Sequence, residues 1–163
     1  MKAFFISKNQ FMFKKITKKK IVLFVLVLLI AFQFIRIDKS TKPVDPALDI
    51  IELTKPDAEI ASVLKASCYD CHSNQPAYPW YTNIAPVSWW IKHHINEGTH
   101  HLNFSDWGNY TQKRKDHKLE ECIEMVEEDE MQMSSYTLMH KDAKLSLAQK
   151  TLLINWFKAL KEQ

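Results

Sequence analysis

The sequence is poor in the residues that make tight turns, since its 163 positions include only two glycines and six prolines. Antiparallel sandwiches and barrels need many short strands joined by turns of those residues, so this composition argues against them. Leucine, lysine, glutamate, alanine and methionine, which favour helices, are plentiful. With 46% hydrophobic residues, the chain is long enough for one domain with its own core. The composition therefore predicts an all-α fold.

Acidic residues are absent from the first 20 positions, which contain seven lysines. The whole chain has a formal net charge of +3, so residues 21–163 carry a net charge of −4. Nucleic-acid-binding proteins usually present their positive charge on a folded face, whereas here it lies on a tail. We therefore expect no nucleic-acid partner.

An apolar run follows the lysine-rich tail and covers Ile21 to Ile35, in which Gln33 is the only polar residue. At about 1.5 Å per residue the run spans roughly 22 Å, against a hydrocarbon core of about 30 Å, and flanking residues can extend it by snorkelling. Lysines before the run favour a cytoplasmic N-terminus. We expect a basic cytoplasmic segment at 1–20 and a transmembrane signal anchor at 21–37, with the rest of the chain on the periplasmic side of a bacterial inner membrane. A cleaved signal peptide and a buried core helix are the alternatives.

Three prolines at positions 43, 46 and 56 discourage helix, so residues 38–56 are predicted to be an extended linker and residues 57–163 the domain. Apolar residues then recur at helical spacing in three places. These are Ile60, Val63 and Leu64 after Asp57 as N-cap; Leu119, Cys122, Ile123 and Val126; and Leu153, Trp156, Phe157 and Leu160, after a capping box formed by Ser146 and Gln149. A shorter helix is predicted around 87–97, and an irregular loop at 128–145.

The motif Cys68-Tyr69-Asp70-Cys71-His72 is a Cys-x-x-Cys-His, the signature for covalent attachment of haem c. Two thiols must reach two vinyl groups on one edge of the porphyrin, and the adjacent histidine then lies beneath the iron as an axial ligand. The motif predicts one covalent haem, with Cys68, Cys71 and His72 as binding residues and His72 on the metal. A redox-active cysteine pair, a structural zinc site and a structural disulfide are the alternatives.

Candidates for the sixth iron ligand are numerous, since methionine and histidine can both fill that position. A loop can lie over the far face of a haem while helices hold its edges, and this favours residues 128–145. Within that loop Met131 and Met133 come first, followed by Met139 and His140. The remaining downstream candidates are Met125, His93, His94, His100, His101 and His117.

Aromatic residues gather between positions 78 and 110, where we expect them to wall the haem; the alternative is that they simply form the core. They are Tyr78, Trp80, Tyr81, Trp89, Trp90, Phe104, Trp107 and Tyr110. Cys122, on an apolar helical stripe, is most simply a buried thiol.

Three stretches carry a resemblance to a known family: "CYDCHSNQPAYPWYTNIAPVSWW", "HLNFSDWGNY" and "DEMQMSSYTLMHKDAKLS". They resemble the bacterial haem-binding domain proteins of the cytochrome c type, which usually have one membrane segment followed by one such domain. The resemblance covers about 57–160 and implies a cytochrome c-like helical fold around one haem, with Met131 as distal ligand. Family members usually have proline after that methionine. This chain has Gln132 there, which makes Met133 a nearer rival.

The expected function is electron transfer between periplasmic or membrane redox proteins, with no substrate turned over and no catalytic residue assigned. A haem-based sensor or ligand-binding module is one alternative. A peroxidase-like haem enzyme is another, and it would need His94 or His140 as an acid or base near the iron.

Overall fold

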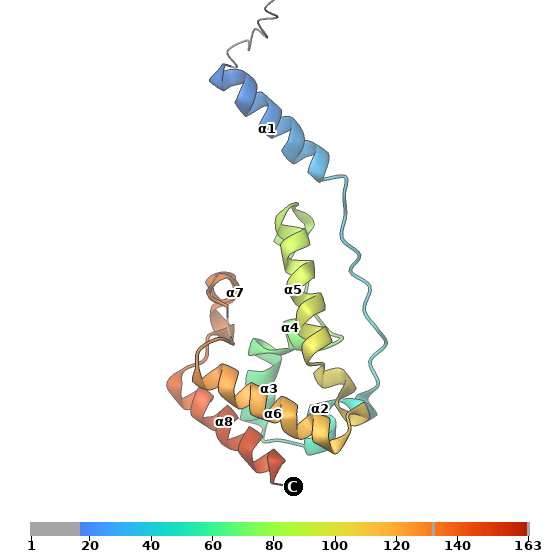
Figure 1. Cartoon of the computed structure of the whole chain (residues 1–163), viewed down its shortest axis with the longest axis vertical. Coiled ribbons are helices and arrows are strands. Elements are labelled where there is room, and N and C mark those ends of the chain that lie inside the picture. Colours follow the sequence, from blue (N-terminus) through green and yellow to red (C-terminus); the bar gives the residue numbers. More distant parts are fainter. Residues whose placement is uncertain (1–16, 132, 163) are drawn as a thin grey trace, which may run out of the picture. The chain divides into compact units, whose positions relative to one another are not determined.

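The structure is a computed structural model that describes residues 17–131 and 133–162, and these form helices without any strand. The chain divides into two compact units, residues 1–36 and residues 37–163, and each is considered by itself (Figure 1). The predicted all-helical fold is confirmed for the described part of the chain.

Helix α1, Lys18–Phe32, lies in the first unit and has no buried residue, so its apolar side chains are exposed around the whole helix. It begins three residues before the predicted apolar run and ends before Gln33. Across residues 17–131 and 133–162, no helix has both the length and the apolar character required to span a membrane.

Residues 38–56 are only partly the extended linker that the prolines predict. The 3₁₀ helix η1, Pro46–Leu48, and helix α2, Ile50–Thr54, occupy the middle of this segment, and Ile50 is fully buried. Asp49 caps α2 by accepting a hydrogen bond from the Ile51 amide, and its carboxylate also accepts one from the Tyr69 hydroxyl at 2.7 Å. The prediction was wrong here because proline is favoured in the first turn of a helix, where Pro46 lies in η1 after its N-cap Asp45, and because Asp49 caps α2.

Helices α3, Ala58–Ser67, and α4, Tyr69–His72, follow each other directly, with Cys68 ending the first and beginning the second. The predicted apolar face of α3 is confirmed, because Ile60, Val63 and Leu64 are all buried. Asp57 occupies the N-cap position as expected, although its side chain makes no capping hydrogen bond.

Helix α5, Val87–His101, is longer than the predicted helix at 87–97. It lies between two 3₁₀ helices, η2 at Trp80–Asn83 and η3 at Phe104–Asn109. Both α5 and η3 contact α4, so these elements surround the Cys-x-x-Cys-His turn.

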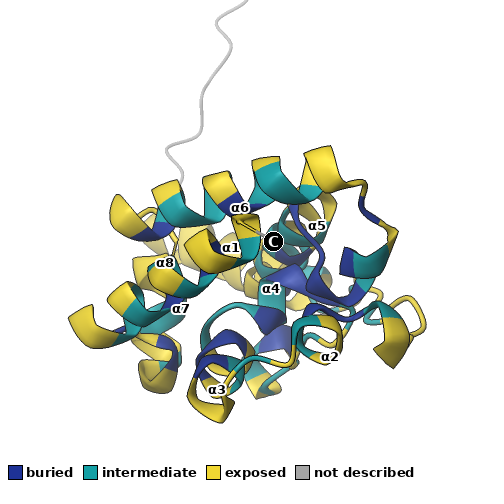
Figure 2. Ribbon diagram, turned by 90° about the horizontal axis from the view of Figure 1, so that it is seen from below, coloured by how far each residue is buried: buried dark blue, intermediate teal, exposed yellow. Residues whose placement is uncertain are grey.

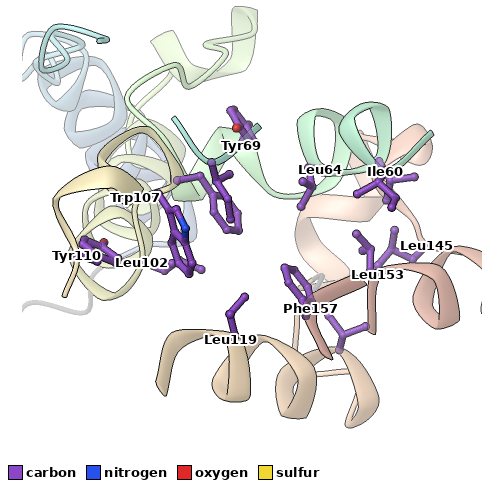
Figure 3. Packing of buried hydrophobic residues seen from close by; sticks show 14 residues of the cluster. Ile60, Leu64, Tyr69, Leu102, Trp107, Tyr110, Leu119, Leu145, Leu153 and Phe157 are labelled. Atoms are coloured by element: carbon purple, nitrogen blue, oxygen red, sulfur yellow. The ribbon is translucent and has the colours of Figure 1, made fainter. Parts of the chain in front are cut away.

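Helices α6, Gln112–Glu127, and α8, Leu147–Lys161, form the most extensive helix pair in the described residues. Their outer faces are largely exposed (Figure 2). The predicted capping box at the start of α8 is confirmed, since Ser146 and Gln149 each bond the other's backbone amide. Figure 3 shows Leu119 of α6 and Leu153 and Phe157 of α8 in the cluster of buried residues that also contains Ile60 and Leu64 of α3.

The segment 128–145 contains regular structure where an irregular loop was expected. Helix α7, Ser134–Met139, and the 3₁₀ helix η4, Lys141–Ala143, lie within it. The prediction failed because α7 buries none of its residues and so has no apolar stripe from which a helix could be recognised.

Candidate haem site

The Cys-x-x-Cys-His motif forms one helical turn. The amide of His72 donates to the Cys68 carbonyl at 2.9 Å, and the amide of Cys71 donates to the same carbonyl at 3.2 Å. Residues three and four positions apart lie on the same face of a helix, so Cys68 presents its side chain on the same side as Cys71 and His72. The turn therefore places two sulfur atoms and one imidazole ring on the same side of the chain.

The His72 ring is held in a defined orientation by two backbone carbonyls. Its Nδ1 lies 3.0 Å from the Gly98 oxygen and 3.2 Å from the Leu102 oxygen. A carbonyl can only accept a hydrogen bond, so Nδ1 carries the proton and Nε2 keeps its lone pair. Burial lowers the pKa of His72, which keeps the ring neutral. A neutral imidazole whose other nitrogen donates to a carbonyl is the form in which histidine binds metals.

Gly98 lets α5 approach this turn closely. A Cβ atom at position 98 would lie 3.1 Å from both the carbonyl carbon and the Cβ of Cys71, and closer still to the Cys71 carbonyl oxygen. Any larger residue would force the two helices apart, so this glycine places the Gly98 carbonyl within reach of His72.

A cavity of about 680 Å³ lies against the motif and is lined by Cys68, Cys71 and His72. This volume falls within the range of cofactor sites. The lining of the cavity is largely apolar and includes core residues. These are Leu102, Phe104, Val126, Leu145, Leu153 and Phe157. The volume, the apolar lining and the convergent sulfur and nitrogen groups fit a haem.

The cysteines of the motif are free thiols. Burial raises the pKa of Cys68 to about 12 and that of Cys71 to about 11, so both are neutral near pH 7. Cys122 also lines the cavity, and burial raises its pKa to about 12. It is a half-buried thiol of the cavity wall rather than a core residue remote from the site.

Three methionines line the same cavity, namely Met125, Met131 and Met133. Met131 follows the end of α6, where its amide donates to the Met125 carbonyl at 3.0 Å. Met131 and Met133 are 39% and 36% exposed, so neither is buried as an ordinary core residue. Both leading candidates for the sixth ligand therefore border the space that His72 faces. Gln132, which occupies the position where family members usually have proline, lies outside the described residues.

A second, more apolar cavity of about 310 Å³ adjoins the first, with which it shares five lining residues: Asp70, Cys71, His94, Met133 and Tyr136. Met139 and His140 line this second cavity and not the first. These two residues therefore border the smaller cavity, whereas Met131 borders the larger cavity, where we expect the haem.

The remaining histidines separate into two groups. His94 lines both cavities, and His101 lines the first. His93, His100 and His117 line neither cavity and are exposed on α5 and α6.

Asp70 is a site residue that the sequence analysis did not single out. One of its carboxylate oxygens accepts from the Ala77 amide at 2.9 Å and the other from the Tyr136 hydroxyl at 2.7 Å. Burial and the Asp70 charge raise the pKa of Tyr136, which keeps the phenol protonated and able to donate. The Tyr136 ring stacks on His140, which in turn hydrogen-bonds Tyr81. These contacts hold α7 and the residue after it, His140, against α4 and η2.

The aromatic residues lie partly at the two cavities and partly in the core. Tyr81 and Trp90 line the second cavity and Phe104 lines the first. Trp107 and Tyr110 are buried core residues, and Trp80 is 70% exposed.

Comparison with known proteins agrees with this geometry. The chain matches the haem-binding domain family over residues 27–159, and it belongs to that family. No curated protein and no solved structure gave a match. The predicted family resemblance is confirmed, and the chain is an all-helical haem-binding domain protein.

Proposed function

We propose that this chain is a membrane-anchored, monohaem c-type cytochrome-like protein that carries electrons on the periplasmic side of a bacterial inner membrane. The observation that carries the proposal is the orientation of His72. Its Nδ1 donates to the Gly98 and Leu102 carbonyls, which leaves Nε2 with its lone pair. The His72 ring lines the same cavity as Cys68 and Cys71.

In this proposal Cys68 and Cys71 hold the porphyrin through thioether bonds. Each thiol would add its S–H across one vinyl C=C of the haem, with sulfur on one carbon and hydrogen on the other, and this addition would consume no oxidant. The spacing of two thiols three residues apart on one helical turn suits that addition. His72 would bind the iron, and Met131 would be its second protein ligand, with Met133 as the rival.

When bound, the haem supplies one-electron chemistry between the ferric and ferrous states of iron. The chain's own residues would bind the haem and fix the orientation of the imidazole. The apolar wall formed by residues such as Phe104, Leu153 and Phe157 lowers the local polarity, which is one of the ways a protein sets a haem potential.

The anchor is proposed for residues 21–37. After its first three residues, which are lysines, helix α1 is apolar on all sides, and an apolar surface of that kind is stable only in a core or a bilayer. The lysines that precede it favour a cytoplasmic N-terminus. The redox partners would then be periplasmic or membrane proteins.

A ligand-binding or peroxidase-like role is the second candidate, and the adjoining cavity favours it. His94 lines both cavities, and its Nδ1 lies 2.8 Å from the Trp90 carbonyl. That nitrogen must donate, so Nε2 is left as a proton acceptor. A small molecule in the second cavity could meet this base.

The effect of carbon monoxide on the absorption spectrum distinguishes an electron carrier from a ligand-binding protein. An electron carrier with two strong axial ligands should show the same reduced absorption spectrum with and without the gas. A large shift in the spectrum would refute the six-coordinate carrier and support the ligand-binding candidate.

The covalent attachment has its own test. Acidified acetone should leave the haem on the wild-type chain and extract it from a variant carrying both Cys68→Ala and Cys71→Ala. Replacement of Cys122 by serine is the matched control, because that thiol lines the cavity but lies outside the motif. Haem retained by the double variant would refute the thioether proposal.

A further inference from the structure

Helix α7 is attached to the turn of the Cys-x-x-Cys-His motif by one side-chain hydrogen bond. None of the residues of α7 is buried, so apolar packing contributes little to its position. The Tyr136 hydroxyl donates to Asp70 Oδ2 at 2.7 Å, across 66 positions of the sequence. Asp70 belongs to α4 and lies between the two cysteines of the motif. The bond therefore joins α7 directly to the turn that we expect to hold the haem.

Both partners of this bond are oriented by further contacts. The Tyr136 ring stacks on His140, with 4.3 Å between the ring centres and 10° between the planes. His140 in turn hydrogen-bonds the Tyr81 hydroxyl of η2. On the other side, Asp70 Oδ1 accepts from the Ala77 amide at 2.9 Å. Side chains that are already oriented lose little entropy when a bond forms between them, so the contact from Tyr136 to Asp70 is a favourable one.

The position of α7 also determines where the two leading candidate ligands lie. Met133 is the N-cap residue of α7, and its carbonyl accepts from the amides of Tyr136 at 2.9 Å and Thr137 at 3.2 Å. Met131 is two positions away, so its Cα lies within about 7 Å of that of Met133. The Met131 amide also donates to the Met125 carbonyl near the end of α6. The two candidates are thus attached to α7 on one side and to α6 on the other.

The same residues lie where the two cavities meet. Asp70, Tyr136 and Met133 line both the larger cavity, where we expect the haem, and the smaller apolar one. They therefore form part of the boundary between the two spaces. Movement of α7 away from α4 would remove that boundary and would give a small molecule a route from the smaller cavity toward the haem.

We propose that Tyr136 is a positioning residue of the haem site. Its bond to Asp70 holds α7, and with it Met131 and Met133, against the larger cavity, so that a methionine sulfur keeps external ligands away from the iron. This inference rests on the six-coordinate haem of the proposed function and adds the contact that maintains it. Without the bond, the same chain would take up small molecules such as carbon monoxide at the iron.

Two substitutions in α7 separate this role from a general effect on the helix. Tyr136→Phe removes the hydroxyl that donates to Asp70 and keeps the ring that stacks on His140. Thr137→Val is the matched control, because it removes a neighbouring hydroxyl whose partner is the Ser134 carbonyl of the same helix. Threonine and valine have similar helix propensities, so the control leaves α7 otherwise unchanged.

A carbon monoxide titration measures how often the methionine leaves the iron. The full chain is matured with haem, held in detergent micelles, reduced and titrated with the gas. The apparent affinity rises by the same factor as the fraction of molecules with an open iron site. A hydrogen bond to a charged group is a strong one, so Tyr136→Phe should raise that affinity at least about tenfold, which corresponds to about 1.4 kcal/mol. Thr137→Val should match the wild type.

Hydrogen exchange of the same haem-loaded samples gives a readout that does not involve the iron. The His140 amide donates to the Tyr136 carbonyl at 3.0 Å, and it should exchange at least about tenfold faster in Tyr136→Phe. The amides of α8 should be unaffected. In a chain that already carries Asp70→Ala, Tyr136→Phe should add nothing to either measurement, because the bond is already lost.

The contrary outcomes are distinguishable. Full uptake of carbon monoxide by the wild type would overturn the six-coordinate carrier and this inference together. A wild type and a Tyr136→Phe variant that both resist the gas would overturn the inference and leave the carrier standing. Faster exchange at His140 without a gain in affinity would show that α7 does not control the iron, which also overturns the inference. Equal gains in Tyr136→Phe and Thr137→Val would overturn the specific role of the bond to Asp70.

Discussion

Replacement of Gly98 by alanine tests the packing that orients His72. The added methyl group would meet the carbonyl carbon and the Cβ of Cys71 at 3.1 Å, and the carbonyl oxygen more closely. Two of these atoms belong to the backbone of α4, so a change of rotamer cannot relieve the contact. The helices α4 and α5 must separate, which also lengthens the hydrogen bond from His72 to the Gly98 carbonyl.

The magnitude follows from two opposing effects. Overpacking costs about 1–3 kcal/mol, and a backbone clash belongs at the upper end of that range. Alanine is better than glycine inside a helix by about 1 kcal/mol. The net loss of stability should be about 2 kcal/mol, which for a domain of this size lowers the melting temperature by about 8 °C.

Thermal unfolding of the full haem-loaded chain in detergent, followed by haem absorption, measures this loss. Asn96→Ala is the matched control, because Asn96 is an exposed residue of the same helix and should gain a few tenths of a kcal/mol from helix propensity. A Gly98→Ala protein as stable as the wild type would refute the close approach of α5 to the motif.

Three further predictions concern the ligands, the core and the buried imidazole. Met131→Ala should abolish the far-red sulfur-to-iron charge-transfer band of the oxidised protein, whereas Met133→Ala should keep it; the opposite pattern would assign the ligand to Met133. Leu153→Ala should destabilise the domain by about 2–5 kcal/mol in urea unfolding, because this side chain is fully buried, while Leu138→Ala, at an exposed position, should change stability by less than about 0.5 kcal/mol. The haem-free protein should lose up to about 1.4 kcal/mol of stability per pH unit as the pH falls below about 6.5, because burial lowers the pKa of folded His72 and the unfolded state then binds more protons. The urea midpoint at pH 7 and pH 5.5 measures this slope, and a His72→Phe variant with the same slope would show that other groups cause it.

Elements that are set by contacts between residues close together in the sequence could be predicted from the sequence alone. The apolar face of α3 and the capping box of α8 both follow from contacts three or four residues apart. Helix α2 and helix α7 could not be predicted in this way. The first is a short helix stabilised by the burial of Ile50 and by the bond between Asp49 and Tyr69, and the second is held through the bond from Tyr136 to Asp70.

By itself, the sequence determined the Cys-x-x-Cys-His turn, because its geometry is set within five residues by local helical hydrogen bonds. Tertiary structure alone decided which carbonyls hold His72, which methionines border its cavity, and that Asp70 inside the motif binds Tyr136. Those contacts join residues that are 26 to 66 positions apart. They exist only because the helices pack in one arrangement, and no local spacing in the chain encodes that arrangement.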